Sequence, residues 1–247
     1  MTIKACNTRI LVGGVDLSGD TNTVAVNIQG RVLEYGVLQD CDTRKLALSP
    51  QASIEHNGYY SGPGASAIEG TLYSYLASTT GVHVAVIYDT AATIPFAYVQ
   101  DTAYNSKLNI AAQAGQLITC AGMWPTLTGT GAQMYRCYQV YGGVISATGA
   151  QTGIDFGAAG TDGGRAYIFV TTITGTATNA AVKLQSDSNA DHSTTVDEGN
   201  TTFSAVGCYE IALSGTVNRY VRFNCTSLGG ATDFTAYVLV GLSGVTV

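Results

Sequence analysis

The chain has 247 residues, of which only 11% are charged, 46% are hydrophobic and 15 are tyrosines. This length allows one large all-β domain or two smaller ones, and the hydrophobic content excludes an intrinsically disordered chain. The net charge is −6, and the chain has no cluster of basic residues other than Arg44-Lys45, so specific nucleic-acid binding is not expected. No apolar run reaches the roughly 18 residues that a membrane span requires, and the first residues lack a signal-peptide core, so we expect neither membrane insertion nor export.

The first distinctive segment is LVGGVDLSGDTNTVAVN, Leu11 to Asn27. A phosphate-binding loop needs G-x-x-x-x-G-K-[ST] or G-x-G-x-x-G between a strand and a helix, and neither spacing occurs here. We therefore interpret the segment as a turn between strands, in which Ser18-Gly19 supplies a positive φ. Short polar side chains would cap the backbone amides of this turn, namely Asp16, Asp20 and Asn22.

Alternation of apolar and polar residues with a period of two runs through most of the chain and predicts half-buried strands. Clear examples are TVAVNIQ, VHVAVIY, MYRCYQVY, CYEIAL, YVRFNC and FTAYVLVGL, bounded by Gly, Ser, Asn or Asp. The neighbours Glu55 and His56 would point to opposite faces of such a strand. The sequence therefore predicts an all-β protein.

One segment has helical spacing instead. Ile68, Leu72 and Leu76 recur at intervals of four, and Ser66 with Glu69 fits an S-x-x-E capping box. We predict one short helix over about residues 66–78, packed against an open side of a sheet or barrel.

A glycine-rich stretch marks a domain boundary. Residues 142–164 contain eight glycines and no Lys or Arg before Arg165, which is typical of linkers and long turns. We expect a β-sandwich or barrel-like domain with one helix over residues 1–150, followed by a second β-sandwich domain over 151–247.

The segment Asp187–Glu198 has the spacing of a twelve-residue calcium loop. Its oxygen ligands would be Asp187, Asn189, Asp191 and Glu198. However, the sixth position, where such a loop requires glycine, is His192, and the preceding AVKLQS alternates like a strand. We predict a solvated loop without a metal, with the calcium site as the alternative.

No constellation of catalytic residues is recognisable. There is no G-x-S-x-G elbow, and the three histidines are His56, His83 and His192, of which His83 alternates with valines in a predicted strand. We therefore predict a protein that is not an enzyme and uses no cofactor. The six cysteines show no C-x-x-C pair and are predicted to be free, mostly buried thiols.

Tyrosine clusters favour self-association. They lie in NGYYSG, LYSYL and MYRCYQVYGG, and tyrosine is enriched at protein interfaces. Strand edges are usually protected by Lys or Pro, and this chain has only four prolines and 11 basic residues. We expect a homo-oligomer that associates through strand edges.

Three segments together resemble structural proteins of tailed bacteriophages: Leu11–Val26, Gln39–Gly62 and Gly215–Leu242. The first domain is most similar to the tail tube proteins of long non-contractile tails, whose subunits join their sheets into rings that stack around a DNA channel. The resemblance implies a virion protein assembled in the host cytoplasm. Its partners would be further copies of itself and other virion proteins, with no membrane.

The resemblance also implies roles for particular segments. Strands around Val24–Tyr35 and Leu108–Trp124 would line the tube, loop residues Asp40–Leu48 would contact the next ring, and the second domain would face outward. The candidates for contacts between subunits are Asp40, Asp42, Arg44, Tyr59 and Tyr60.

Two other functions stay open at this point. A capsid decoration (cement) protein would also be acidic, β-rich and symmetric, for example as a trimer. A calcium-assisted carbohydrate-binding module would use Asp187–Glu198 and nearby tyrosines.

Overall fold

The computed structural model describes residues 7–35, 44–62, 64, 67–76, 78–126 and 134–243, with backbone alone for 31–35 and 44–50. The described residues are mostly β-strands with one short helix, which confirms the predicted all-β class. Among them, no helix is long and apolar enough to cross a membrane. Two contact candidates, Asp40 and Asp42, lie outside the described residues, as does the predicted capping residue Ser66.

Contacts within the chain define two units. Unit 1 comprises Met1–Asp16, Ile87–Ala97 and Arg136–Val247, and unit 2 comprises Leu17–Val86 and Tyr98–Tyr135. This division does not coincide with the expected boundary near residue 150. Residues 136–150 group with the C-terminal part because the strand that contains them pairs with the last strand of the chain.

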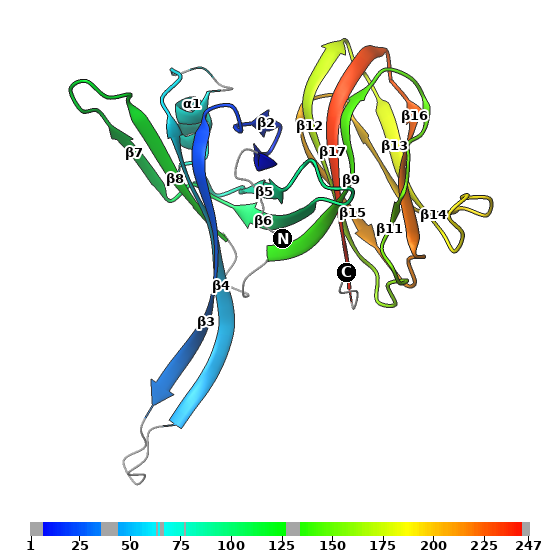
Figure 1. Cartoon of the computed structure of the whole chain (residues 1–247), viewed down its shortest axis with the longest axis horizontal. Helices are drawn as coiled ribbons and strands as arrows, with labels where there is room; N and C mark the ends of the chain where they lie inside the picture. Colours follow the sequence, from blue (N-terminus) through cyan, green and yellow to red (C-terminus); the bar gives the residue numbers. More distant parts are fainter. Residues whose placement is uncertain are drawn as a thin grey trace. The chain divides into compact units, whose positions relative to one another are not determined.

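Unit 2 contains a four-stranded antiparallel sheet in the order β3-β4-β8-β7 (Figure 1). The strands are β3 (Thr21–Tyr35), β4 (Arg44–Tyr59), β8 (Thr119–Pro125) and β7 (Lys107–Ala111). In β4 the residues from Ser53 to Tyr59 pair with β8, whereas pairing with β3 continues from there to Arg44. β3 and β4 therefore form a long two-stranded ribbon that extends beyond β8.

The helix of unit 2, α1, is shorter than predicted. It spans Ile68–Ser74, its N-cap is Ala67 with no side-chain hydrogen bond, and Tyr75 is its C-cap. Ile68 and Leu72 are fully buried as expected, but Leu76 lies beyond the helix and is 41% exposed. The predicted end at residue 78 is wrong because the chain leaves the helix at Tyr75 and bridges from Leu76 to Asn105.

Two further strands connect the units along the chain. β5 (Val82–Tyr88) and β6 (Phe96–Ala103) each contain one of the points where the chain passes between units. Their residues in unit 2 include Val84, Val86 and Val99, which are all fully buried. The strand predicted from VHVAVIY is thus part of the core.

Unit 1 is a β-sandwich. One layer consists of the strands β15-β12-β17-β9, which are part of a sheet that continues through β6, β5, β1 and β2. The other layer is a sheet in the order β10-β16-β13-β14, with β11 also paired to β16. Buried side chains from both sheets form one hydrophobic cluster, in which Phe223 and Phe234 are fully buried. The strands are β9 (Met134–Ile145), β10 (Gly149–Ala150), β11 (Ile154–Asp155), β12 (Gly164–Gly175), β13 (Ala180–Asp187), β14 (Val196–Phe203), β15 (Gly207–Leu213), β16 (Tyr220–Ser227) and β17 (Ala231–Leu242).

The glycine-rich segment near the start forms a hairpin and a turn, as predicted, but with a different glycine in the strained position. β1 (Arg9–Val12) pairs with β2 (Val15–Asp16) around Gly13, whose φ is 56°. The positive φ predicted at Ser18-Gly19 is wrong, because this second turn is closed by hydrogen bonds to the carbonyl oxygen of Leu17, which accepts from the backbone N–H of Asp20 and of Thr21 (3.2 and 3.1 Å).

The polar side chains of this segment also contact other side chains. Asp16 pairs with Arg9, and Asp20 accepts a hydrogen bond from the hydroxyl of Ser61 at 2.6 Å. Asn22 accepts one from the hydroxyl of Thr23 at 2.9 Å.

Four cysteines lie in the described residues and are free thiols: Cys120, Cys137 and Cys225, which are buried, and Cys208, which is half-buried. Burial raises the pKa of Cys120 to about 11 and that of Cys137 further still. The thiols of Cys120 and Cys137 therefore stay protonated and poorly reactive at neutral pH.

Candidate assembly interface

The sheet of unit 2 has one buried face and one open face. Toward α1 it presents residues of β4 and β8 that are all buried: Ile54, His56, Gly58, Cys120, Gly122 and Trp124. Two of these are glycines because other groups occupy the space of a side chain. A Cβ on Gly58 would sit 2.2 Å from the carbonyl oxygen of Asp20 and 2.8 Å from Ile68 Cδ1, and one on Gly122 would sit 2.1 Å from Leu72 Cδ2. The short helix therefore seals this face of the sheet.

A buried aromatic pair lies under the helix. The indole N–H of Trp124 donates to Nδ1 of His56 at 3.0 Å, and the two rings stack with centroids 6.1 Å apart. The acceptor role of Nδ1 fixes the neutral tautomer with hydrogen on Nε2. Burial lowers the pKa of His56 to about 4. His56 is thus buried and Glu55 exposed, as their positions in a strand predicted.

Asn105 fastens the helix to the sheet. It is fully buried, and its side-chain amide donates to the carbonyl oxygen of Leu72 at 2.8 Å. Its Oδ1 accepts from the backbone N–H of Lys107 (3.3 Å) and of Met123 (3.4 Å). One side chain therefore joins α1, β7 and β8.

We expect Asn105→Leu to destabilise unit 2 by about 2–3 kcal/mol, because it leaves one buried carbonyl and two amides without partners. Urea unfolding followed by the fluorescence of Trp124 measures this change. Asn109→Leu is the matched control, since Asn109 lies exposed on the same strand, and should alter stability by less than about 0.5 kcal/mol. Equal effects of the two substitutions would contradict the role given to Asn105.

The other face of the sheet is open and polar. It carries Thr23, Ala25, Glu55, Lys107 and Asn109, all exposed, in the register that places them opposite to the α1 side. A hollow of about 280 Å³ lies over this face, and its charged lining residues are Glu55 and Lys107. The face therefore presents hydroxyl, amide and small side chains with little net charge.

Both edges of this sheet are unpaired among the described residues, since β3 pairs with β4 alone and β7 with β8 alone. β7 is exposed along almost its whole length. Unpaired edge strands carry free N–H and C=O groups and are templates for pairing with another chain.

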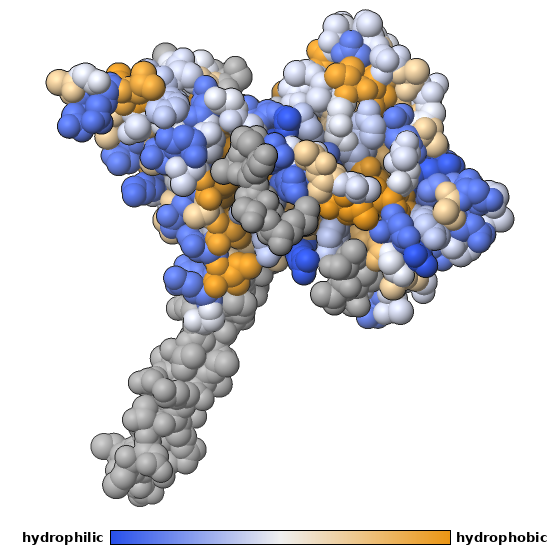
Figure 2. All heavy atoms as spheres, in the orientation of Figure 1, coloured by the Kyte–Doolittle hydropathy of each residue, from blue (hydrophilic) through white to orange (hydrophobic). Residues whose placement is uncertain are grey.

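Exposed apolar side chains gather at one end of the sheet, and we call them the apolar tip: Tyr59, Tyr60, Ile110, Leu117 and Ile118. Their exposed fractions run from 36% for Tyr60 to 69% for Leu117. The backbone N–H of Tyr60 donates to the carbonyl oxygen of Ile118 at 2.9 Å, which joins the two halves of the tip. Figure 2 shows hydrophobic residues in orange at the end of the β7–β8 hairpin.

The contact candidates from the sequence are only partly brought together. Tyr59 and Tyr60 lie side by side in the apolar tip, whereas Arg44 begins β4 opposite Tyr35. A 16-residue strand separates Arg44 from Tyr59, a distance of about 50 Å in extended backbone. The apolar residues of the β7–β8 hairpin were missed, because exposed Leu and Ile beside Gly and Gln do not form a periodic pattern.

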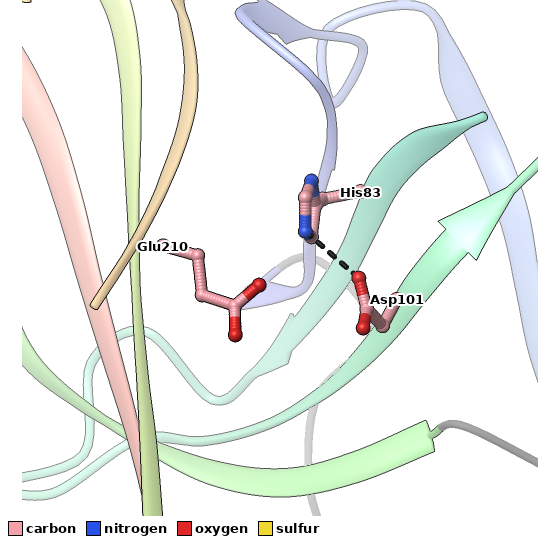
Figure 3. A group of neighbouring side chains, drawn as sticks. All are labelled: His83, Asp101 and Glu210. Atoms are coloured by element: carbon pink, nitrogen blue, oxygen red, sulfur yellow. Dashed lines mark ion pairs between the residues drawn. The ribbon is translucent and has the colours of Figure 1, made fainter. Parts of the chain in front are cut away.

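His83 is paired with a carboxylate. Its Nε2 lies 2.8 Å from Oδ1 of Asp101, across β5 and β6 within unit 2 (Figure 3). Asp101 is buried, and the hydroxyl of Thr102 also donates to it, at 3.1 Å. His83 therefore lies beside the buried carboxylate of Asp101 on a strand, in line with its predicted place among valines.

The loop with calcium-like spacing belongs to unit 1 and uses its oxygens internally. Asp187 is fully buried and accepts hydrogen bonds from the backbone N–H groups of Asn189 (2.9 Å) and Thr194 (2.7 Å). Asp191 accepts from the N–H of Ser193, and Glu198, on β14, accepts from the hydroxyl of Ser186. These bonds lower the pKa of Asp187 and hold the loop as a β-hairpin connection.

We expect millimolar calcium to leave the melting temperature within about 1 °C, because the loop carboxylates already satisfy backbone and hydroxyl donors. Differential scanning calorimetry with calcium and with a chelator makes the comparison. If the loop bound calcium, a calcium concentration 100 times the Kd would raise the free energy of unfolding by about 2.7 kcal/mol. A rise of several degrees would therefore show that Asp187–Glu198 binds calcium.

Comparisons with known proteins gave weak structural likenesses. No protein-family model and no curated protein matches the chain. A chain in the sheath–tube complex of an extracellular contractile injection system is 12% identical with a TM-score of 0.40, over 55% of this chain and 90% of that one. A chain of a native gene transfer agent virion is 7% identical with a TM-score of 0.40, over 53% and 99%. The Dit protein of phage SPP1 is 9% identical with a TM-score of 0.31, over 95% and 98%. TM-scores this low do not establish a shared fold.

Proposed function

We propose that the chain is a non-enzymatic structural subunit of a phage tail, which assembles through the sheet edges of unit 2 into the rings of a tail tube. The observation that carries this proposal is the four-stranded sheet with two unpaired edges, β3 and β7, and one open polar face. The segments that resemble tail tube proteins include the start of β3 and all of β4.

Closure of a ring follows from the two edges being different. β3 of one copy pairs with β7 of the next, so the contact is heterologous, and it generates a ring where the rotation between neighbouring copies divides a full turn. Each pairing supplies hydrogen-bond partners to backbone N–H and C=O groups that would otherwise bond only to water. The apolar tip at the end of this sheet is covered in the same contact.

The open polar face suits a channel wall for DNA. Its lining has one acidic and one basic residue in the hollow, Glu55 and Lys107, and the chain as a whole carries a charge of −6. Such a surface does not neutralise a row of phosphates, so DNA slides past without being held. Unit 1 then lies outward as the β-sandwich decoration, where it contacts other virion proteins.

Negative-stain electron microscopy of the purified full chain tests the proposal. We expect closed rings, or coaxial stacks of rings, at micromolar concentration. Immunogold labelling of intact particles then locates the protein. Label along the tail supports the proposal, whereas label confined to the head contradicts it and favours the decoration protein.

A further inference from the structure

Unit 1 has a groove that plays no part in the proposed assembly. It has a volume of about 460 Å³, and its walls are the loop Thr90–Pro95 and the segment Gln151–Asp155. Its floor is the stretch Gln139–Gly142 of β9. Ligand pockets of folded proteins usually measure about 300–1,000 Å³, so the groove is large enough for a small organic molecule.

Both walls are held by backbone hydrogen bonds. The N–H of Gln139 donates to the carbonyl oxygen of Pro95 at 2.8 Å, which fixes the first wall to the floor. The N–H of Gln151 donates to the carbonyl oxygen of Phe223 at 2.8 Å, and Ile154 pairs with Val221. The groove is therefore formed before any ligand arrives, which lowers the entropic cost of binding.

One polar atom in the floor has no partner. Oε1 of Gln139 is buried and accepts no hydrogen bond. The same amide fills the space beside Gly142, where a Cβ would lie 2.0 Å from Nε2. A buried acceptor left without a donor costs about 1–3 kcal/mol, so a turn of the Gln139 amide toward the groove, where it meets a donor, is favoured when a ligand is present.

The lining is polar but carries no free charge. Its other side chains include the hydroxyls of Thr90, Thr93 and Thr152 and the amide of Gln151. The only charged lining residue is Asp155, and Arg219 donates two hydrogen bonds to its carboxylate, at 2.6 and 2.7 Å. This pairing, together with the N–H of Gly157, lowers the pKa of Asp155. The groove therefore favours a neutral ligand rich in hydroxyl groups.

An aromatic ring completes the floor. Tyr141 is half-buried and stacks on Phe223, with centroids 5.7 Å apart and an angle of 22° between the rings. Its hydroxyl donates to the carbonyl oxygen of Val144 at 2.9 Å, so the ring is held at both ends. A rigid aromatic ring beside amides and hydroxyls matches the two surfaces of a sugar, which has apolar C–H faces and an equatorial rim of hydroxyls.

From these features we propose that the Gln139–Tyr141 groove is a binding site for neutral oligosaccharides of one to three pyranose rings. Sugar hydroxyls bond to Gln151 and Asp155, and a pyranose face lies against Tyr141. The amide of Gln139 turns toward the groove, and its Oε1 accepts a hydrogen bond from a further sugar hydroxyl. The site needs no calcium and does not involve Asp187–Glu198. It does not depend on the tail function, because every residue that forms it belongs to unit 1.

Saturation-transfer NMR with the full chain tests the site, and it works equally well for a monomer and for an assembly. The probes are maltotriose, cellotriose and N,N′-diacetylchitobiose, each titrated to about 10 mM. We expect at least one of them to bind saturably with a Kd of about 1 mM or tighter, which corresponds to about 4 kcal/mol. If none of the three gives a saturable signal, the groove is only hydrated and the proposal is overturned.

Substitutions then assign the binding to the groove. Gln139→Leu and Gln151→Ala should each weaken the binding by tenfold or more. The side chain of Gln151 is only half-buried, so Gln151→Ala is expected to fold normally even if Gln139→Leu does not. Asn179→Ala is the matched control, since it removes an exposed amide of unit 1 outside the groove, and should change Kd by less than twofold. Unchanged binding in both groove variants would overturn the assignment.

Discussion

Lowering the pH from 7 to 5 is expected to destabilise unit 2 by about 2 kcal/mol through His56 alone. The pKa of this histidine is lowered from 6.5 to about 4 by burial. Its neutral form is therefore favoured in the folded state, and the unfolded chain takes up a proton first as the pH falls. The contribution is complete above pH 6.5 and is lost between pH 6.5 and pH 4.

Trp124 is the only tryptophan of the chain and donates a hydrogen bond to His56, so its fluorescence reports on this event directly. Urea unfolding at pH 7 and pH 5 gives the two free energies. In His56→Gln the loss between the two pH values should shrink by about 2 kcal/mol. His192→Gln is the control, because His192 belongs to unit 1 and Trp124 does not report on it. An equal loss in wild type and His56→Gln would show that His56 does not control the pH dependence.

Leu117→Glu is expected to raise the protein concentration needed for assembly by tenfold or more. Leu117 is 69% exposed in the isolated chain and belongs to the apolar tip that the proposed ring contact covers. Covering it removes apolar surface from water, whereas covering an unpaired carboxylate costs several kcal/mol. Sedimentation velocity over a concentration series measures the shift.

Gln113→Glu is the matched control for this experiment. It adds the same charge to the same β7–β8 connection at another exposed residue, and it should leave assembly within about twofold of wild type. Neither substitution should change the stability of the folded subunit by more than about 0.5 kcal/mol. If Leu117→Glu assembles at the wild-type concentration, the apolar tip lies outside the contact between subunits.

The sequence predicts the strands well because burial of one face imposes a period of two on the residues themselves. The strand predicted from VHVAVIY is β5, and the predicted opposite orientation of Glu55 and His56 is observed in β4. The helix was found from Ile68 and Leu72, but its end was not, since the chain turns at Tyr75 to reach Asn105. That turn depends on a contact between residues distant in sequence, and no local pattern reports it.

The membership of β9 in unit 1 was hidden for the same reason. β9 pairs with β17, so that Ile145 lies opposite Phe234, although 88 residues separate them in the chain. Glycines near residue 150 indicated a boundary from composition alone. The groove was missed too, because Gln139, Gln151 and Thr90 come from three segments that only the folded sandwich brings together.

The chain begins in unit 1, passes to unit 2 for residues 17–86 and returns to unit 1 for residues 87–97. It passes to unit 2 again for residues 98–135 and ends in unit 1 from Arg136 onward. During synthesis, the segments of unit 2 have therefore emerged from the ribosome before the last strands of the sandwich exist. Unit 2 is able to fold early, whereas unit 1 waits for β17, whose partners β9 and β12 precede it by many residues. A nascent subunit thus exposes its sheet edges before its sandwich is finished. In the proposed assembly, we expect slow translation or truncation near the C-terminus to favour premature association on the polysome.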